Sequence, residues 1–509
     1  MADTNKFLEI IKAAYSFKGE SFVAGAGMLD GKVVDQATIY IPLKTMNRHG
    51  LIAGATGTGK TKTLQMLAEG LSDASVPVVL MDIKGDLSGI GAAGTPNEKI
   101  ADRCKMLGIE YKPMAYPVEF LSLSKQKGTR LRATVSEFGP VLLSRILGLN
   151  DTQESFVAMI FKYCDDHKLP LVDLKDMIKV LQFASNEGKT ELTKDYGNIS
   201  TASLGTILRK LIELQQQGAD LFFGETSFEV EDLMRIDEKG RGMVSVIRVT
   251  DLLDRPKLFS TFMLQLLAEL YASCPEEGDA DKPKLVMFID EAHLIFNEAS
   301  EALLQQIETI VKLIRSKGIG IFFCTQNPMD IPASVLAQLG MKVQHALRAF
   351  TAADRKMIKQ TAENYPETDF YDTDELITAM GIGEALITLL NEKGIPSALV
   401  HTMMAPPKSR MDILTEGEME TIIEHSKLAA KYNQVVDEKS AYEILTEKLN
   451  SAAETKEEVK TKETKADKEK GFFDDPIVKS MTRTAGNTIV RGLLGVLGLG
   501  GSRRRKSLF

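Results

Sequence analysis

Residues 54–61 read Gly-Ala-Thr-Gly-Thr-Gly-Lys-Thr, which matches the G-x-x-x-x-G-K-T pattern of a Walker A phosphate-binding loop. Glycines in such a loop let backbone N–H groups turn inward onto phosphate oxygens, an approach that side chains would block. Lys60 is expected to reach the β- and γ-phosphates, and the Thr61 hydroxyl is expected to hold Mg²⁺. We therefore predict a site for ATP and Mg²⁺ whose binding residues are Gly54, Ala55, Thr56, Gly57, Thr58, Gly59, Lys60, Thr61 and Lys62.

Two acids that follow the apolar run Lys284–Ile289 form a second chemical group. An apolar strand that ends in Asp-Glu, downstream of a Walker A loop, is typical of a Walker B motif. Asp290 would hold Mg²⁺ through water, and Glu291 would polarise the attacking water as a general base. His293 comes two residues later, and it is either a coupling residue or simply the start of a helix.

Polar residues also end two other apolar runs. Gln326 lies just beyond Ile319–Cys324, where a polar side chain beside the Walker B strand can sense the γ-phosphate; its alternative role is to cap the next turn. The run Val76–Met81 is likewise followed by three charged residues, Asp82, Lys84 and Asp86. Because ligands bind outside the carboxyl ends of strands in open α/β sheets, we expect these three side chains near the phosphates. The alternative is a plain polar turn.

The elements around these motifs alternate between strands and helices. Gly50–Ala53 is suited to a buried parallel strand, and residues 61–71 have the apolar spacing of a helix whose dipole points at the bound anion. Further runs predict strands at residues 242–249, 342–350, 384–390 and 397–403. The pattern predicts an α/β fold: a RecA-like P-loop core with a mostly parallel sheet, a helical insertion and a short N-terminal β element.

The chain has 509 residues, which is too long for one ordinary domain. Residues 140–235 carry amphipathic helical patterns separated by turns, and they interrupt the α/β pattern. We predict the following division: an N-terminal β element (1–47), the first part of the ATPase core (48–139), a helical insertion (140–240), the second part of the core (241–409), C-terminal helices (410–450), a charged linker (451–470) and an amphipathic basic tail (471–509).

The overall composition is that of an ordinary globular protein. The 62 basic and 70 acidic residues give a net charge of −8, which carries no global signal for nucleic acid but does not exclude a local basic stripe. The four cysteines are scattered without a CxxC or Cys/His cluster, so no structural zinc site is predicted, and His167 is expected to be a surface residue. No secretory signal and no long apolar run is present, so we expect a cytoplasmic protein.

The end of the chain differs in composition from the rest. Residues 454–470 are a run of Lys and Glu that predicts a solvated linker. Residues 477–499 are amphipathic and contain glycine, and the basic tip Arg503–Lys506 follows them. Three interpretations of this tail stay open: contact with the anionic phosphates of a membrane or a nucleic acid, docking on the chain's own surface, or no specific role.

The combination of a P-loop, Asp-Ile-Lys-Gly-Asp at 82–86, Asp-Glu-Ala-His at 290–293 and Thr-Gln-Asn-Pro-Met-Asp-Ile-Pro at 325–332 is more specific than any one motif. It resembles the HerA/FtsK superfamily of ring-forming motor ATPases, and it is most similar to the bacterial branch described as helicase HerA-like, C-terminal. The resemblance implies a homo-hexamer with ATP between neighbouring subunits. One subunit would supply the loop, the acids and the sensor, which correspond to Lys60, Thr61, Asp290, Glu291 and Gln326.

The resemblance also implies that the neighbouring subunit supplies an arginine finger. In the family, a finger lies on the helix just before the sensor strand, which corresponds to Arg315 here. An arginine just ahead of the Walker A strand acts at the same interface in relatives, which points to Arg48. Arg348 and Arg355 are further candidates. The alternative for Arg315 is an ordinary cation near a helix C-terminus.

Two departures from the family bear on partners. Archaeal relatives carry an N-terminal β-barrel that docks a nuclease, whereas some 47 residues precede the core here, so partnership with that nuclease is in doubt. No DNA-reading module of the kind found in chromosome-segregation pumps is recognisable. The expected function is a double-stranded-DNA translocase or helicase-like motor. The alternatives are an ATPase engine for another polymer or a secretion-type system, and a nucleotide-switched regulatory ATPase.

Overall fold

The computed structural model describes residues 3–461 except 124, 199, 253–254, 279, 297–300, 435 and 437–438. The predicted tail, residues 471–509, lies outside the described residues. The described chain forms two compact units. The first comprises the chain up to Arg130 and Glu229–Tyr432, and the second comprises Leu131–Phe228 with the described residues from Asn433 onward.

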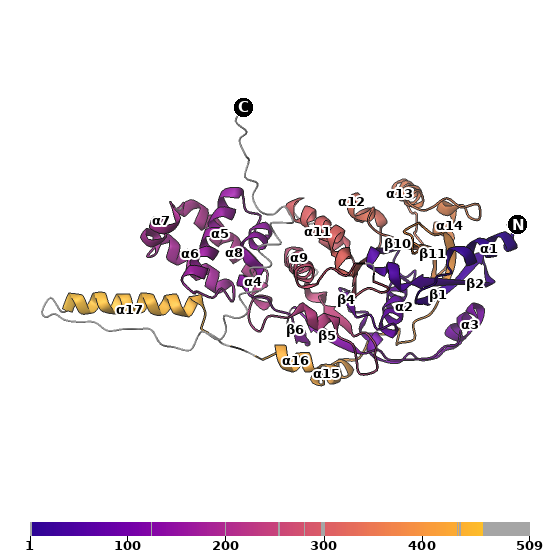
Figure 1. Cartoon of the computed structure of the whole chain (residues 1–509), viewed down its shortest axis with the longest axis horizontal. Coiled ribbons are helices and arrows are strands. Elements are labelled where there is room, and N and C mark those ends of the chain that lie inside the picture. The colour runs from indigo at the N-terminus through magenta and orange to yellow at the C-terminus, as the bar shows by residue number, and fades with distance from the viewer. Residues whose placement is uncertain are drawn as a thin grey trace, which may run out of the picture. The chain divides into compact units, whose positions relative to one another are not determined.

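The first unit is built on one sheet (Figure 1). Its strands lie in the order β2-β1-β12-β11-β10-β3-β9-β8-β4-β7-β5-β6. Their bounds are β1 Ser21–Leu29, β2 Lys32–Pro42, β3 Gly50–Ala53, β4 Val78–Asp82, β5 Val118–Ser122, β6 Thr129–Arg130, β7 Val244–Arg248, β8 Leu285–Ile289, β9 Ile319–Thr325, β10 Met341–His345, β11 Glu384–Thr388 and β12 Val400–Met404.

The sheet has a parallel part and an antiparallel part. All neighbours from β10 through β3, β9, β8, β4, β7 and β5 to β6 pair in parallel. The strands β11, β12, β1 and β2 continue the sheet with antiparallel pairs. Strands β3, β4, β8 and β9 are buried along their whole length, as parallel strands covered on both faces must be, which explains their uninterrupted apolar sequences. The predicted α/β fold with a mostly parallel sheet is confirmed.

The N-terminal β element is a hairpin that belongs to this sheet. Strand β1 pairs with β12 in the register Ala26 to Met403. Helix α1 covers the hairpin through Phe7 and Ile11, which are fully buried in one apolar cluster with Ile39. Residues 21–42 therefore extend the core sheet at the edge opposite β6.

Helices of the first unit connect and cover the strands. Helix α2 joins β3 to the parallel strand β4, and its Leu64, Leu67 and Leu71 lie in one apolar cluster with Ile52 and Val78. This packing fixes the start of α2 relative to the end of β3. The helices are α1 Thr4–Ala14, α2 Lys60–Asp73, α3 Glu98–Leu107, α9 Pro256–Ser273, α10 His293–Phe296, α11 Glu301–Ile314, α12 Ala333–Leu336, α13 Ala352–Ala362, α14 Thr373–Ala379, α15 Glu416–Glu424 and α16 Lys427–Tyr432.

The second unit is helical where the structure describes it. Three of its helices begin with reciprocal capping boxes, in which the cap and the third residue bind each other's backbone, at Thr134, Asn150 and Asp173. None of the helices in the described part of the chain is long and apolar enough to cross a membrane. The helices of this unit are α4 Val135–Ile146, α5 Asp151–Asp166, α6 Leu174–Ser185, α7 Lys189–Tyr196, α8 Thr201–Gln216 and α17 Ala441–Thr461.

The bounds of the units differ from the predicted division by about ten residues. The helical unit runs over residues 131–228 rather than 140–240, because 230–234 form a turn that packs on α9 and β4 of the sheet unit. Helix α17 reaches Thr461, so it includes the first part of the predicted linker 451–470. His167 is part-exposed, stacked on Tyr163 with ring centroids 4.1 Å apart, with Nε2 3.3 Å from Glu191.

Candidate active site

The P-loop lies at the carboxyl edge of the parallel sheet, between the end of β3 and the start of α2. Gly54 and Gly59 have φ values of 152° and 116°, which only glycine adopts readily. A Cβ on Gly54 would stand 2.5 Å from the Cβ of His345, so the loop has no room for a side chain there. The sequence motif is therefore needed for the shape of the loop as well as for phosphate contact.

Lys60 is the first residue of α2, and its side chain folds back over the loop. Its Nζ donates to the carbonyl oxygens of Gly54 at 2.6 Å and Ala55 at 3.1 Å. Burial and the nearby charge of Lys84 lower the pKa of this ammonium. Lys62 turns the other way, since its Nζ donates to the Met411 carbonyl. A contribution of Lys62 to phosphate binding would therefore come from its backbone N–H.

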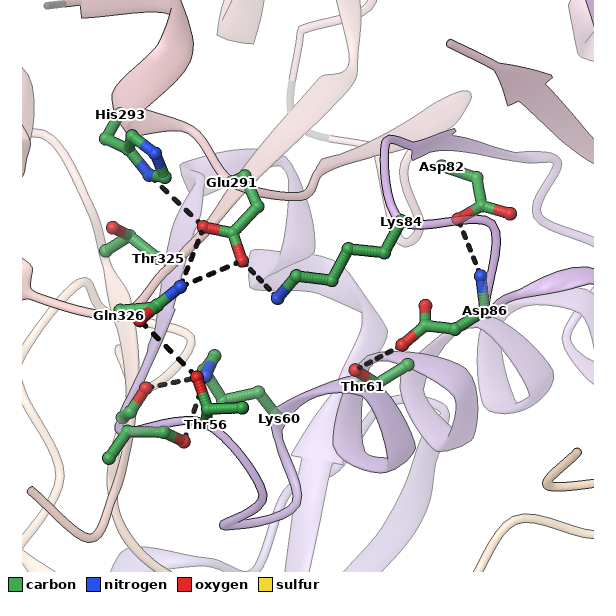
Figure 2. Close-up of polar contacts among 12 residues, drawn as sticks. Thr56, Lys60, Thr61, Asp82, Lys84, Asp86, Glu291, His293, Thr325 and Gln326 are labelled. Atoms are coloured by element: carbon green, nitrogen blue, oxygen red, sulfur yellow. Dashed lines mark hydrogen bonds and ion pairs between the residues drawn. The ribbon is translucent and has the colours of Figure 1, made fainter. Parts of the chain in front are cut away.

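The predicted base and sensor meet beside the loop (Figure 2). Gln326 Nε2 lies 3.3 Å and 3.4 Å from the two carboxylate oxygens of Glu291, and Gln326 Oε1 accepts from the Thr56 hydroxyl at 3.4 Å. His293 Nδ1 lies 3.2 Å from Glu291 Oε2, and Lys84 forms an ion pair with Oε1. Strand β9 lies between β3 and β8, so its end carries Gln326 into the space between the P-loop and the Walker B acids.

Glu291 is buried but ionised. Burial pushes the pKa of its carboxyl upward, but the Lys84 ammonium and the Gln326 amide outweigh burial, so the pKa lies below its ordinary value. Its backbone is in the left-handed region, with φ 45°, which turns the chain sharply after β8. A carboxylate that is ionised and held at the edge of the P-loop can accept a proton from water.

Side-chain oxygens of Thr61 and Asp86 meet at the start of α2, and oxygen atoms are the ligands that Mg²⁺ prefers. The Thr61 hydroxyl donates to Asp86 Oδ2 at 3.3 Å, while Asp86 Oδ1 is buried without a hydrogen-bond partner. Burial raises the pKa of Asp290 to about 6, and the charge of Lys84 opposes that rise. No cluster of three or more His, Cys, Asp or Glu side chains that could hold a metal ion occurs in the described residues. Asp86 joins Thr61 and Asp290 as a candidate ligand.

Asp82 shapes the loop that carries Lys84 and Asp86. Its Oδ1 accepts from the backbone N–H groups of Gly85 at 2.8 Å and Asp86 at 3.1 Å, and Oδ2 accepts from Leu87 at 3.4 Å. Burial and the charge of Asp86 raise the pKa of Asp82 to about 6. The carboxylate binds three backbone N–H groups of its own loop, so Asp82 positions the segment that carries Lys84 and Asp86.

Two of the predicted trans arginines, Arg48 and Arg315, lie at the amino ends of the parallel strands, opposite to the P-loop, whereas Arg348 follows the carboxyl end of β10. Arg48 precedes β3 and Arg315 precedes β9, and these two strands are parallel neighbours. Strand β3 alone spans about 13 Å at the usual rise of a strand, so neither arginine reaches its own P-loop. Arg315 is exposed, and the Arg48 guanidinium lies against Gly394. Arg348 donates to the Thr378 carbonyl at 2.8 Å, and Arg355 is exposed on α13.

His49 connects the segment that carries Arg48 with the segment that carries Arg315. His49 is buried; its Nδ1 accepts from the Ile321 N–H at 3.0 Å, and its Nε2 donates to the Val311 carbonyl at 2.8 Å. A proton added to Nδ1 would face another donor. Burial and the charge of Arg315 lower the pKa of His49 to about 4, although the Val311 carbonyl opposes that shift.

His345, which no sequence motif pointed to, lies against the P-loop at Gly54. Its Nδ1 donates to the Glu384 carbonyl at 2.9 Å, and Nε2 lies 3.0 Å from the Thr63 hydroxyl on α2. Burial lowers the pKa of His345 to about 4 as well. A histidine at the end of a predicted strand could have been noticed, but its contact with the P-loop depends on β10 lying beside β3.

These two histidines make stability depend on pH. Both have folded pKa values below the unfolded value of about 6.5, so the unfolded chain binds more protons as pH falls from 6.5 to 4. Each then costs up to about 3 kcal/mol of folding free energy at the acid end of that range. The measurement is the free energy of unfolding in urea across this pH range. Its slope with pH should correspond to about one proton fewer in His49→Asn than in the unaltered protein. Equal slopes for His49→Asn and the unaltered protein would contradict the assignment.

Taken together, a phosphate loop between a parallel strand and a helix, with an acid pair and a glutamine at the same edge, is the arrangement of a P-loop ATPase of the RecA-like class. The chain belongs to the family described as helicase HerA-like C-terminal, whose model matches residues 28–475. The resemblance stated from the sequence motifs is thereby confirmed.

Individual relatives are distant. The DNA double-strand break repair helicase HerA of Saccharolobus solfataricus is 22% identical over 389 residues, covering 74% of this chain and 68% of the helicase. The DNA import protein CedB of Sulfolobus acidocaldarius is 23% identical over 363 residues, covering 69% of this chain and 51% of that protein. The chain therefore spans about two thirds of the length of the HerA helicase and half of CedB.

Among solved structures, this chain resembles the plasmid coupling protein TrwB in complex with the non-hydrolysable GTP analogue GDPNP, with a TM-score of 0.51. The match covers 80% of this chain and 95% of TrwB at 13% sequence identity. At this identity, the likeness establishes a shared fold.

Proposed function

We propose that this chain is an ATP-hydrolysing motor that assembles as a ring and moves double-stranded DNA. The observation that carries the proposal is the position of Glu291. It is buried, paired with Lys84, and linked through Gln326 to Thr56 of the P-loop. A protein that only sensed nucleotide would not need a general base at this position.

In this proposal, the residues of one subunit divide the work of hydrolysis. Lys60 contacts the β- and γ-phosphates, and Gln326 reports the γ-phosphate. Thr61 and Asp290, with Asp86, hold Mg²⁺, which neutralises charge on the phosphates. Glu291 accepts a proton from the attacking water. Buried surroundings strengthen each of these electrostatic contacts relative to bulk water.

A ring completes the site in this proposal. Arg48 and Arg315 lie at the sheet edge away from their own P-loop, so they can act only on the nucleotide of another copy. A head-to-tail ring, which brings that edge of one subunit to the P-loop of the next, satisfies this requirement. Six copies are proposed from the family resemblance. The names of HerA and CedB support DNA as the substrate.

The test is ATP hydrolysis measured with and without duplex DNA. We expect duplex DNA to stimulate hydrolysis at least several-fold, and light scattering to report about six protomers. Lys60→Ala should lose nucleotide binding, whereas Glu291→Gln should bind ATP and retain duplex DNA. Hydrolysis that DNA does not change, with no DNA retained by Glu291→Gln in ATP, would contradict the DNA-motor proposal. A monomer at every concentration would contradict the ring.

A further inference from the structure

Lys84 is a cation at the site to which the hydrolysis scheme assigns no role. It lies in the loop after β4, which pairs in parallel with β8 in the register Met81 to Ile289. The side chain therefore leaves one strand and meets Glu291 at the end of its neighbour (Figure 2). The Asp82 carboxylate accepts hydrogen bonds from backbone N–H groups of this loop. The backbone at Lys84 is therefore held in place.

Lys84 forms an ion pair with Glu291, the proposed general base. Lys84 Nζ pairs with Glu291 Oε1, and Gln326 Nε2 lies within 3.4 Å of both oxygens. Glu291 is nearly inaccessible, with 5% of its side chain exposed, whereas 37% of the Lys84 side chain is exposed. The cation is thus the partner that is free to move, and while it stays on Oε1 it competes with water for that oxygen.

A γ-phosphate would offer Lys84 a second anionic partner. Lys84 pairs with Glu291, and Gln326 links Glu291 to Thr56 of the P-loop, so Lys84 lies near the end of the loop where the terminal phosphate is expected. A phosphate oxygen forms charge-assisted hydrogen bonds with an ammonium at least as strong as those of a carboxylate. The long, rotatable side chain of lysine suits such an exchange better than a fixed arginine fork.

We propose that Lys84 exchanges between Glu291 and the γ-phosphate, binding the base when the γ-phosphate is absent and the phosphate when ATP is bound. ATP binding then frees a Glu291 oxygen to accept the proton of the attacking water. Loss of the γ-phosphate returns Lys84 to Glu291. The inference rests on the proposed ATPase function and adds a residue that contacts the phosphate and controls access to the base.

The exchange predicts a specific pattern of nucleotide affinities. The quantity to measure is the ratio of affinities for the non-hydrolysable analogue AMP-PNP and for ADP, each with Mg²⁺. Glu291→Gln removes the competing anion, so it should raise this preference for the triphosphate about tenfold. Lys84→Met should lower the preference about tenfold. Combined with Lys84→Met, Glu291→Gln should have no further effect.

Two control variants test whether the effect is specific to Lys84. Lys284→Met removes another lysine–glutamate pair, with Glu277 at 2.7 Å, at the opposite end of the same strand β8, and should leave the ratio unchanged. Lys84→Arg keeps a cation that both anions can bind, so it should lower the ratio less than Lys84→Met does. An equal effect of Glu291→Gln with and without Lys84, or an unchanged ratio in Lys84→Met, would overturn the exchange. Failure of the unaltered protein to hydrolyse ATP would contradict the proposed function instead.

Discussion

Glu291→Gln is expected to lower kcat for ATP hydrolysis about 10³-fold while ATP binding persists, because it removes the only proposed proton acceptor without removing a phosphate contact. Glutamine has the same shape as glutamate and can keep a hydrogen bond with Gln326, which lies 3.3 Å from the carboxylate. The loss should therefore fall on the chemical step, and KM should not rise.

Two measurements separate this result from a general loss of structure. Steady-state hydrolysis gives kcat, and titration with a fluorescent ATP analogue gives affinity. Glu277→Gln, a change of the same type at the far end of β8, should leave both values unchanged. A variant Glu291→Gln that keeps more than about a tenth of kcat would show that another group accepts the proton.

The fold and much of the candidate site could be predicted because their signals are local. The Walker A loop, the Walker B acids and Gln326 each follow the carboxyl end of an apolar strand. The carboxyl ends of parallel strands meet at one edge of the sheet. That rule alone brings Thr56, Gln326 and Glu291 together, as the structure does. Their catalytic roles remain predictions.

Other features depend on contacts between residues far apart in the chain. Strand β5 has no uninterrupted apolar run, since Glu119 lies within it. Glu119 is tolerated inside because Arg235 and Thr129 each lie 3.0 Å from its carboxylate, and Arg235 is more than a hundred residues away. In the sequence alone, a buried acid whose partner is far away in the chain cannot be told from an acid in an exposed loop.

The same limit explains why some site residues escaped prediction. The pairing of Lys84 with Glu291 requires β4 to lie beside β8, and the contact of His345 with the P-loop requires β10 to lie beside β3. Strand order follows from how all the helices pack on the sheet, and no single motif encodes it. Sequence reasoning placed Lys84 near the phosphates but could not name its partner.

The position of Arg315 leads to the second large effect. Arg315 lies at the edge of the sheet away from the P-loop, so Arg315→Ala should leave the subunit's own nucleotide contacts intact. It should still lower hydrolysis about 10³-fold, because an arginine finger acting on a neighbour's nucleotide would be lost. Lys312→Ala is the matched control, since Lys312 is an exposed cation in the last turn of α11 and should have little effect. Nucleotide titration should give equal affinities for the two variants.

Mixing two inactive variants distinguishes action on a neighbour from action within one chain. Lys60→Ala keeps Arg315 but lacks a working P-loop, and Arg315→Ala keeps the P-loop but lacks the finger. In a mixed head-to-tail ring, about a quarter of the interfaces join an intact P-loop to an intact Arg315, so about that share of activity should return. If mixed rings form, as co-purification of one variant through an affinity tag carried by the other would report, and hydrolysis stays absent, Arg315 does not complete a neighbour's site. Recovery would require that each nucleotide is hydrolysed by two subunits together.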